Sequence, residues 1–278
     1  MLFRSDQAAP TLEENTCENN ALNGIYYADN AGGTARKNIC RGNTLSGIAA
    51  FGQAAPTLEE NTCENNAKYG IYYGGNAGGT ARNNICRGNT WSGIAAFDQA
   101  APTLEENTCE NNAFHGIQYS GNAGGTARKN SGSGLLERLL GLSDGGNAGG
   151  TARKNICRGN TLSGIAARDQ AAPTLEENTC ENNGQHGIYY GGNAGGTARN
   201  NICRGNGDSG IRIFGTVRRV WIFDNLCEQN QYGIQIGASA WDWKGNIRVL
   251  HSGQEDADSR NTCLNNRSAN WSWNSIVD

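Results

Sequence analysis

The chain has 278 residues, a formal net charge of −3 and 37% hydrophobic residues, with 40 glycines and four prolines. Without a basic excess, nucleic acid is not expected as a partner, and no run of about 18 apolar residues is present to span a membrane. Balanced charge and a fixed register of apolar positions argue against disorder.

The first ten residues lack the apolar core of a signal peptide and enter a repeat at once. Such a start is typical of a fragment, or of a chain whose first coil has no cap. An uncapped N-terminal coil allows end-to-end or lateral self-association. The sequence indicates no compartment.

The dominant pattern is a 23-residue period marked by cysteine, from Cys17 to Cys109 and again from Cys157 to Cys203. Asparagine stands two residues before and three after each of these cysteines, and Gly-Ile follows at seven and eight. A repeat this short cannot bury its own core, so the copies must stack into a solenoid.

Each copy accommodates three short strands whose side chains alternate inward and outward. In the first copy we expect strands over residues 11–14, 16–18 and 24–27. The residues expected to point inward are Leu12, Cys17, Ile25 and Tyr27. The matching residues of the second copy are Ala35, Cys40, Ile48 and Ala50. At two of these positions large and small residues alternate between coils, which fills the axis by interdigitation.

The ten cysteines are expected to form one buried, reduced row, since their fixed phase stacks them from coil to coil. Disulfides between coils and binding of a soft metal are the alternatives, although no C-x-x-C pair with zinc spacing occurs. We expect no metal site and no cofactor. The flanking asparagines are expected at bends, where each amide bonds its own backbone and the matching amide of the next coil.

Charge alternates between successive copies, so the true unit is a pair of coils 46 residues long. Glu18 aligns with Arg41, Glu13 with Arg36, and Glu14 with Lys37. Neighbouring coils lie about 4.8 Å apart, so opposite charges meet across strands and fix the register. This ladder argues against Glu13 and Glu14 as a catalytic carboxylate pair.

The pattern N-x-C-x-x-N followed by x-x-x-G-I resembles the right-handed parallel β-helix repeats of the pectate-lyase-like superfamily. More narrowly, it resembles the nitrous-oxide-accessory-type (NosD-like) and carbohydrate-binding sugar-hydrolase repeats, over residues 7 to about 236. The resemblance implies an all-β, right-handed, single-stranded parallel β-helix (β-solenoid) of about ten 23-residue coils. That superfamily includes polysaccharide lyases, hydrolases and epimerases as well as non-enzymatic modules, so the resemblance implies carbohydrate contact without fixing an activity.

The regular spacing breaks between Cys109 and Cys157, which stand 48 residues apart. The nine residues 122–130 recur unchanged at 147–155. We therefore expect one degenerate coil near 131–146, with a slip in the charge alternation that sets Arg128 against Arg153. That slip would make this coil the weakest point of the stack.

The same segment contains an L-x-x-L-L pattern, which is a partner-helix motif. Its leucines are Leu136, Leu139 and Leu140. A local hydrophobic patch is the plainer interpretation, because so short a helix is marginal alone. Flanking Gly-Ser residues also suit an engineered graft at 131–146.

After residue 236 the repeat becomes irregular, and we place a Trp-rich C-terminal cap at 237–278. A cap would plug the core and block edge pairing. The alternative is an aromatic ligand site with Trp241 and Trp243. If the protein is an enzyme, the expected catalytic acids are Asp242, Asp256 and Asp258.

Along the Gly-Ile strand, the residue after Ile points outward, and tyrosine recurs there at Tyr26, Tyr72 and Tyr189. On every second coil such rings stand about 9.6 Å apart. They are candidate platforms for sugar rings, although tyrosine is also simply a good strand residue. His115 and His186 lie too many coils apart to share a metal.

The leading hypothesis is a non-catalytic repeat scaffold or binding module for polysaccharide or a protein surface. A first alternative is a carbohydrate-active enzyme, a polysaccharide lyase or hydrolase, that uses the C-terminal acidic and aromatic loop. A second is an engineered β-solenoid scaffold that carries a grafted segment.

Overall fold

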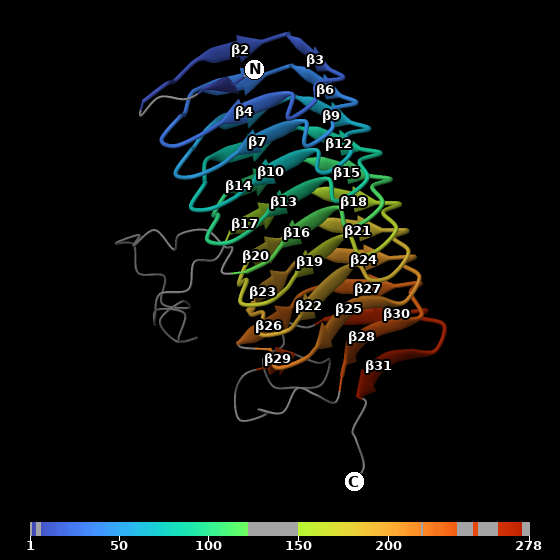
Figure 1. Ribbon diagram of the computed structural model, residues 1–278. Helices are drawn as coiled ribbons and strands as arrows, with labels where there is room; N and C mark the ends of the chain where they lie inside the picture. The colour runs from blue at the N-terminus through green and yellow to red at the C-terminus, as the bar shows by residue number, and fades with distance from the viewer. Residues whose placement is uncertain are drawn as a thin grey trace.

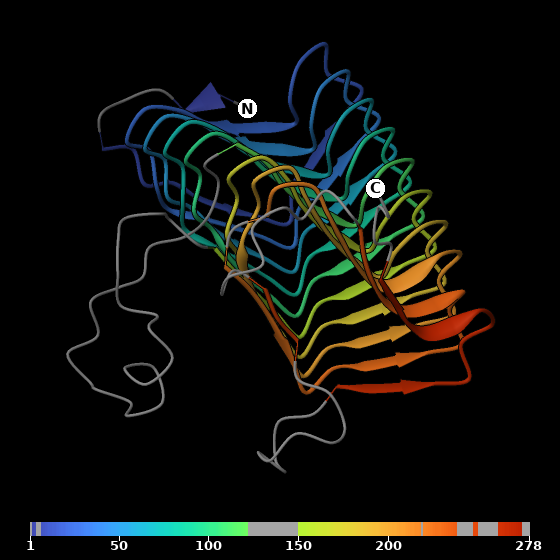
Figure 2. The ribbon, with the colours of Figure 1, turned by 90° about the horizontal axis from the view of Figure 1, so that it is seen from below.

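The computed structural model describes residues 2–3, 7–121, 150–217, 219–237, 247–249 and 261–273, and all regular structure in them is β-strand. Each coil contributes one strand to each of three parallel sheets, so that the chain winds as a β-solenoid (Figure 1). Seen from below, successive coils repeat the same outline, each displaced from the one before it (Figure 2). The expected all-β solenoid of short coils is confirmed.

Sheet A has eleven strands in the described chain. They are β1 (Leu2–Phe3), β4 (Ile25–Tyr27), β7 (Ile48–Ala50), β10 (Ile71–Tyr73), β13 (Ile94–Ala96), β16 (Ile117–Tyr119), β19 (Ile165–Ala167), β22 (Ile188–Gly191), β25 (Ser209–Phe214), β28 (Tyr232–Ile236) and β31 (Ala269–Trp273). Every one of these strands runs parallel to its neighbours, and the Gly-Ile motif places the strand start.

Sheets B and C each have ten strands in the same part of the chain. The strands of sheet B are β2 (Thr11–Glu13), β5 (Thr34–Arg36), β8 (Thr57–Glu59), β11 (Thr80–Arg82), β14 (Thr103–Glu105), β17 (Thr151–Arg153), β20 (Thr174–Glu176), β23 (Gly196–Arg199), β26 (Val220–Phe223) and β29 (Ile247–Val249). The strands of sheet C are β3 (Thr16–Glu18), β6 (Ile39–Arg41), β9 (Thr62–Glu64), β12 (Ile85–Arg87), β15 (Thr108–Glu110), β18 (Ile156–Arg158), β21 (Thr179–Glu181), β24 (Ile202–Arg204), β27 (Leu226–Glu228) and β30 (Thr262–Leu264).

The first strand of each coil ends one residue earlier than the sequence suggested. Glu14 has a φ of 56°, in the left-handed region, and Lys37 has 54° at the matching position of the next coil. A residue with that backbone conformation cannot continue a strand, so it turns the chain from sheet B into sheet C.

The core is a set of side-chain rows along the axis. Leu12, Cys17, Ile25 and Tyr27 are buried, as are Ala35, Cys40, Ile48 and Ala50. Cysteine faces cysteine in the register of sheet C, and all ten cysteines are free thiols, nine of them buried. The alternation of tyrosine with alanine along sheet A is also confirmed, because Tyr73 lies between Ala50 and Ala96.

The glycine of each Gly-Ile motif is required by the closeness of the next coil. A Cβ atom added to Gly70 would lie 2.6 Å from the carbonyl oxygen of Gly93 and 2.9 Å from Cβ of Cys86. No side chain fits at such distances, so the motif is a packing requirement of the stack.

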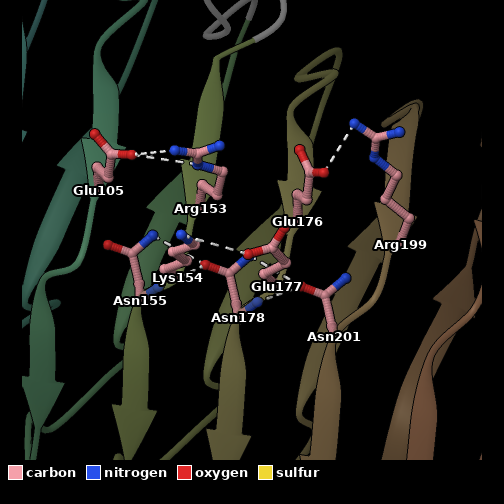
Figure 3. Close-up of polar contacts among 9 residues, drawn as sticks. All are labelled: Glu105, Arg153, Lys154, Asn155, Glu176, Glu177, Asn178, Arg199 and Asn201. Carbon is pink, nitrogen blue, oxygen red and sulfur yellow. Dashed lines mark hydrogen bonds and ion pairs between the residues drawn. The ribbon is translucent and has the colours of Figure 1, made fainter.

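Two ladders of asparagine run along the stack, as expected. In the ladder before cysteine, the side-chain amide of Asn155 donates to Oδ1 of Asn178 at 2.9 Å, and Asn178 donates to Asn201 at the same distance (Figure 3). Each of these amides also donates to a backbone carbonyl of the preceding coil, Leu104 in the case of Asn155. The buried amides are thereby satisfied from rung to rung.

The expected degenerate coil between Cys109 and Cys157 is wrong. Strand β15 pairs directly with β18, so that Cys109 faces Cys157, and β14 and β16 likewise pair directly with β17 and β19. The asparagine ladder is also continuous across this join and holds the two coils together, because the Asn107 side chain donates directly to Oδ1 of Asn155 at 3.0 Å.

The expected slip in charge alternation is wrong for the same reason. Arg153 lies opposite Glu105, with 2.6 Å between Nη2 and Oε1, and Lys154 reaches Glu177 at 3.8 Å (Figure 3). The direct pairing therefore gives no support to a weak point at this join. Residues 122–149, with Arg128, Leu136, Leu139 and Leu140, lie outside the described residues.

Opposite charges meet along the outer faces of sheets B and C, as expected. Glu18 pairs with Arg41 at 2.7 Å, Glu13 pairs with Arg36, and Lys37 Nζ lies 4.0 Å from Glu14.

At the C-terminal end, β29, β30 and β31 each add to one of the three sheets, so the stack continues past residue 236. In the part of the chain that is described, no helix is long and apolar enough to cross a membrane.

Candidate binding groove

The outer face of sheet A is built from four positions on each coil, counted from the Ile that begins the strand motif. Two lie in the turn before the strand, three and two residues ahead of Ile, and the others lie one and three residues after it. In the later coils these positions carry mainly polar and charged side chains, which line a groove of about 420 Å³. The lining residues are Arg168, Gln185, His186, Tyr189, Asp208, Arg212, Phe214, Gln231, Tyr232 and Gln235.

Two arginines lie over aromatic rings in this groove. The guanidinium carbon of Arg168 is 5.3 Å from the ring centre of Tyr189, and that of Arg212 is 5.3 Å from the ring centre of Phe214. Cation–π contact orients a guanidinium without neutralising its charge. Nη1 of Arg212 is buried and has no hydrogen-bond partner among the described residues. The groove thus offers a buried cationic donor with no acceptor.

His186 lies in the turn that enters β22 and stacks on Tyr189, with ring centres 5.5 Å apart. Its Nδ1 accepts the backbone N–H of Ser209 at 3.4 Å, and Asp208 Oδ2 lies 3.8 Å from the same atom. Burial lowers the pKa of His186 to about 4; Asp208 opposes this and Arg212 adds to it. The ring is therefore neutral near pH 7, and its proton sits on Nε2, because Nδ1 is occupied as an acceptor.

The floor of the groove is fixed by a side-chain hydrogen bond between coils. The hydroxyl of Ser209 donates to Oε1 of Gln235 at 3.0 Å, and both residues are buried. Since Ser209 also donates its backbone N–H to His186, one residue holds polar groups of three successive coils in place.

In the earlier coils six residues at these positions are aromatic, and they are here called the aromatic patch. Its members are Phe51, Tyr69, Tyr72, Trp91, Phe97 and Phe114. Tyr69 is buried and stacks on Tyr72 at 5.2 Å, while Trp91 packs edge-on against Tyr69 at 5.1 Å. Phe114 continues the contact beyond Trp91 at 6.4 Å.

A second hollow of about 370 Å³ lies at the turn after sheet A and is lined by Asp98, Gln99, Gly121, Asp169 and Gln170. Its two carboxylates already have partners. Oδ2 of Asp98 accepts the Gly75 N–H, and Oδ2 of Asp169 accepts the Gly121 N–H, each at 3.1 Å. These aspartates serve the turns between coils. Among the described residues, no group of three or more His, Cys, Asp or Glu side chains is arranged to hold a metal ion.

A family model described as "Right handed beta helix region" matches residues 2–134 and 137–275. The chain belongs to the right-handed β-helix family. The handedness that the repeat motif implied is thereby confirmed. A search of the curated proteins found no match.

Two solved structures are similar to this β-helix. One is the A-module of the mannuronan C-5 epimerase AlgE4 of Azotobacter vinelandii, with 15% identity and a TM-score of 0.49 over 83% of this chain and 73% of that chain. The other is the AlgE6 A-module of the same organism, with 11% identity and a TM-score of 0.41 over 98% of this chain and 59% of that chain. At such identities likeness of fold does not transfer an activity.

The tyrosines predicted to face outward on the β-helix lie on the outer face of sheet A. Tyr189 lines the groove, Tyr72 belongs to the aromatic patch, and Tyr26 is half-buried on the first coil. The rings of Tyr72 and Tyr189 lie along the strand, over the glycine two residues further on, instead of projecting away from the sheet. A Cβ atom added to Gly74 would lie 2.6 Å from Oη of Tyr72, and Gly191 is related to Tyr189 in the same way at 2.4 Å.

The remaining predicted site residues lie outside the described part of the β-helix: Trp241, Trp243, Asp242, Asp256 and Asp258. Sequence reasoning missed Arg168 and Arg212 as site residues. The signal was present, because Arg168 stands where two earlier coils have Phe51 and Phe97, and Arg212 stands where the neighbouring coil has Tyr189.

Proposed function

We propose that this β-helix is a non-catalytic module that binds an acidic polysaccharide in the groove on sheet A. The observation that carries the proposal is the guanidinium of Arg212, whose buried Nη1 has no acceptor among the described residues. A buried charged donor without a partner costs free energy, and a carboxylate or sulfate group on a ligand removes that cost. Arginine is well suited to such anions, because its planar guanidinium can donate two parallel hydrogen bonds to two oxygens of one group.

The rest of the lining suits a sugar chain. Tyr189 and Phe214 offer apolar ring surface beside the two guanidinium groups, and Gln185, Gln231 and Tyr232 add polar atoms at the rim. A mixture of ring faces and convergent hydrogen-bonding groups is typical of ligand sites that hold polar molecules with apolar faces. The lining residues come from four successive coils, so the groove extends along the stack, as an extended polymer requires.

The geometry at His186 favours binding over catalysis. A general base needs a free lone pair toward the ligand, but Nδ1 of His186 accepts the Ser209 N–H. The neutral ring therefore presents an N–H donor at Nε2 and adds a hydrogen bond to a bound oxygen.

The experiment is calorimetric titration with uronate oligosaccharides and with neutral oligosaccharides of equal length. We expect uronate binding only, and Arg212→Gln is expected to weaken it at least about tenfold, as loss of a charge-assisted contact does. Arg153→Gln is the matched control, because Arg153 is an arginine on the outer face of sheet B that is paired with Glu105.

Equal affinity of Arg212→Gln and the unchanged protein would overturn the proposal, and so would equal binding of neutral sugars. Release of an unsaturated uronate product, or of reducing ends, would overturn its non-catalytic part and favour a polysaccharide lyase or hydrolase.

A further inference from the structure

We infer that a single polysaccharide chain lies along the axis of the stack and covers both the groove and the aromatic patch, so that the module selects long chains over short ones. This inference rests on the proposed function and adds a second contact region to it. The patch supports it by its composition, its exposure and its alignment with the groove.

The patch is a continuous aromatic surface. Ring contacts join its members in series: Tyr72 stacks on Tyr69, Tyr69 packs against Trp91, and Trp91 packs against Phe114. Phe97 packs edge-on against both tyrosines, at 5.7 and 5.8 Å. Among the residues that the structure describes, the only charged group in ring contact with it is Lys68, with Nζ 5.3 Å from the centre of Trp91.

The outer rings of the patch are open to solvent. Trp91 is 39% exposed, Phe51 44% and Phe114 45%, while Tyr69 beneath them is 5% exposed. A contiguous aromatic surface that retains this exposure marks a binding surface more often than a structural one. Aromatic faces stack on the apolar faces of sugar rings, and such surfaces need no charge on the ligand.

The patch and the groove occupy the same positions of the repeat. Three residues before Ile stand Trp91 and Phe114 in the patch, and Asp208 in the groove. Three residues after Ile stand Phe97 in the patch and Arg168 in the groove. The two regions are therefore consecutive stretches of one track on the outer face of sheet A.

The track is continuous across the join between the two halves of the chain. Phe114 is followed on the next coil by Leu162, whose N–H donates to the Phe114 carbonyl at 2.9 Å. From β7, which precedes Phe51, to β25, which ends at Phe214, the order of sheet A gives six strand spacings, or about 29 Å. A ligand that contacts both ends must therefore be extended over about 29 Å, which a polysaccharide chain is and a small sugar is not.

The test is a length series of uronate oligosaccharides, from a dimer to a chain able to span about 29 Å. Affinity is expected to keep rising after the groove is filled. Trp91→Gln is expected to lower the affinity of the longest chain about tenfold, as loss of roughly 1.4 kcal/mol does, and to leave the dimer unaffected. Arg212→Gln is expected to weaken every length.

The repeat itself indicates which substitutions in the patch should preserve the fold. Gln185 occupies the Trp91 position in a later coil, and Ser120 occupies the Phe97 position, so Trp91→Gln and Phe97→Ser introduce residues that this stack already accommodates. Both variants are expected to retain the melting transition of the unchanged protein and to lose long-chain affinity alike.

An affinity that stops rising once the groove is filled would overturn the inference while leaving the proposed function intact. Self-association in the absence of sugar that Trp91→Gln abolishes would also overturn it, by assigning the patch to a second copy. Failure of every length to bind would instead reject the proposed function, and the inference with it.

Discussion

At the scale of single residues, the asparagine ladders provide hydrogen-bond partners for the polar groups that are buried at the bends between strands. Oδ1 of Asn107 accepts both the backbone N–H and the side-chain amide of Asn84, at 3.0 and 2.9 Å. Its own amide donates to Asn155 and to the Ala81 carbonyl. One side chain therefore satisfies buried groups on three coils, which explains why the residue recurs without change in type.

Asn107→Ala is expected to destabilise the protein by at least about 2 kcal/mol, because each buried group left without a partner costs about 1–3 kcal/mol. Urea unfolding followed by circular dichroism measures it. Asn111→Gly is the control, since Asn111 is exposed with a φ of 54° and Gly159 occupies its position on the next coil. The control is expected to change stability by less than about 0.5 kcal/mol. Equal effects of the two substitutions would contradict this role of the ladder.

The residue two positions before Ile has a similar structural task. Asn23 Oδ1 accepts the Ser46 N–H at 3.0 Å, and Nδ1 of His115 accepts the Ser163 N–H at 3.2 Å. Burial, with Arg168 adding to it, lowers the pKa of His115 from 6.5 to about 3. The unfolded chain therefore binds a proton on this ring at a higher pH than the folded protein does.

It follows that His115 makes stability depend on pH. Its contribution is complete above pH 6.5 and is lost as the pH falls from there toward 3, because only the unfolded state gains the proton. His115→Asn keeps the acceptor and removes the titration. The slope of unfolding free energy against pH is expected to fall by up to about 1.4 kcal/mol per pH unit. Unfolding curves at a series of pH values measure the slope, and an unchanged slope would count against the buried neutral ring.

At the scale of elements, the strands are short, and the alternating charges of their last residues align them. Glu105 meets Arg153 and Glu176 meets Arg199, each pair in strand register. A single exposed pair contributes only about 0–1 kcal/mol. Pairing that skips one coil, however, sets like charges against each other at that join in both sheet B and sheet C, so the ladder specifies register more than it adds stability.

The direct pairing at the join predicts that a deletion is tolerated. Removing residues 122–146 restores a 23-residue spacing between Cys109 and Cys157 and joins Gly121 to Asn147, as Gly75 is joined to Asn76. No rung is lost, since β15 already pairs with β18. The free energy of unfolding is expected to stay within about 1 kcal/mol of the unchanged protein. Loss of the cooperative transition in denaturant would show that the deleted residues hold the stack together.

The strands, the inward rows, the amide ladders and the ion pairs were predictable from the sequence, because each depends on a residue recurring at a fixed period. The join was not predictable. Residues 122–130 and 147–155 are identical, so either copy fits the register, and only contacts across the join, such as that of Asn107 with Asn155, decide between them. The period identifies the strands of a coil but does not say which other coil lies beside it.

At the scale of the whole molecule, the groove and the aromatic patch arise from departures from the repeat rather than from the repeat itself. Arg168, Arg212 and Asp208 replace residues of other types at positions that every coil has. Such replacements form a site only when their coils are neighbours, which is a property of the stack. Sequence reasoning identified Tyr189 as a ligand candidate but had no means of grouping it with these charges.

The continuous track on sheet A, and the stack itself, depend on β14 and β17 being direct neighbours. Cross-linking the double variant Glu105→Cys/Arg153→Cys tests this most directly, since a disulfide needs Cα atoms about 4.4–6.8 Å apart and adjacent coils lie about 4.8 Å apart. We expect mild oxidation to join residues 105 and 153 in the native protein, as mass spectrometry of peptides would show. The pair Glu105→Cys/Glu176→Cys, two coils apart, is expected to stay reduced. Absence of the 105–153 link would mean that a further coil separates these strands, and would contradict the account.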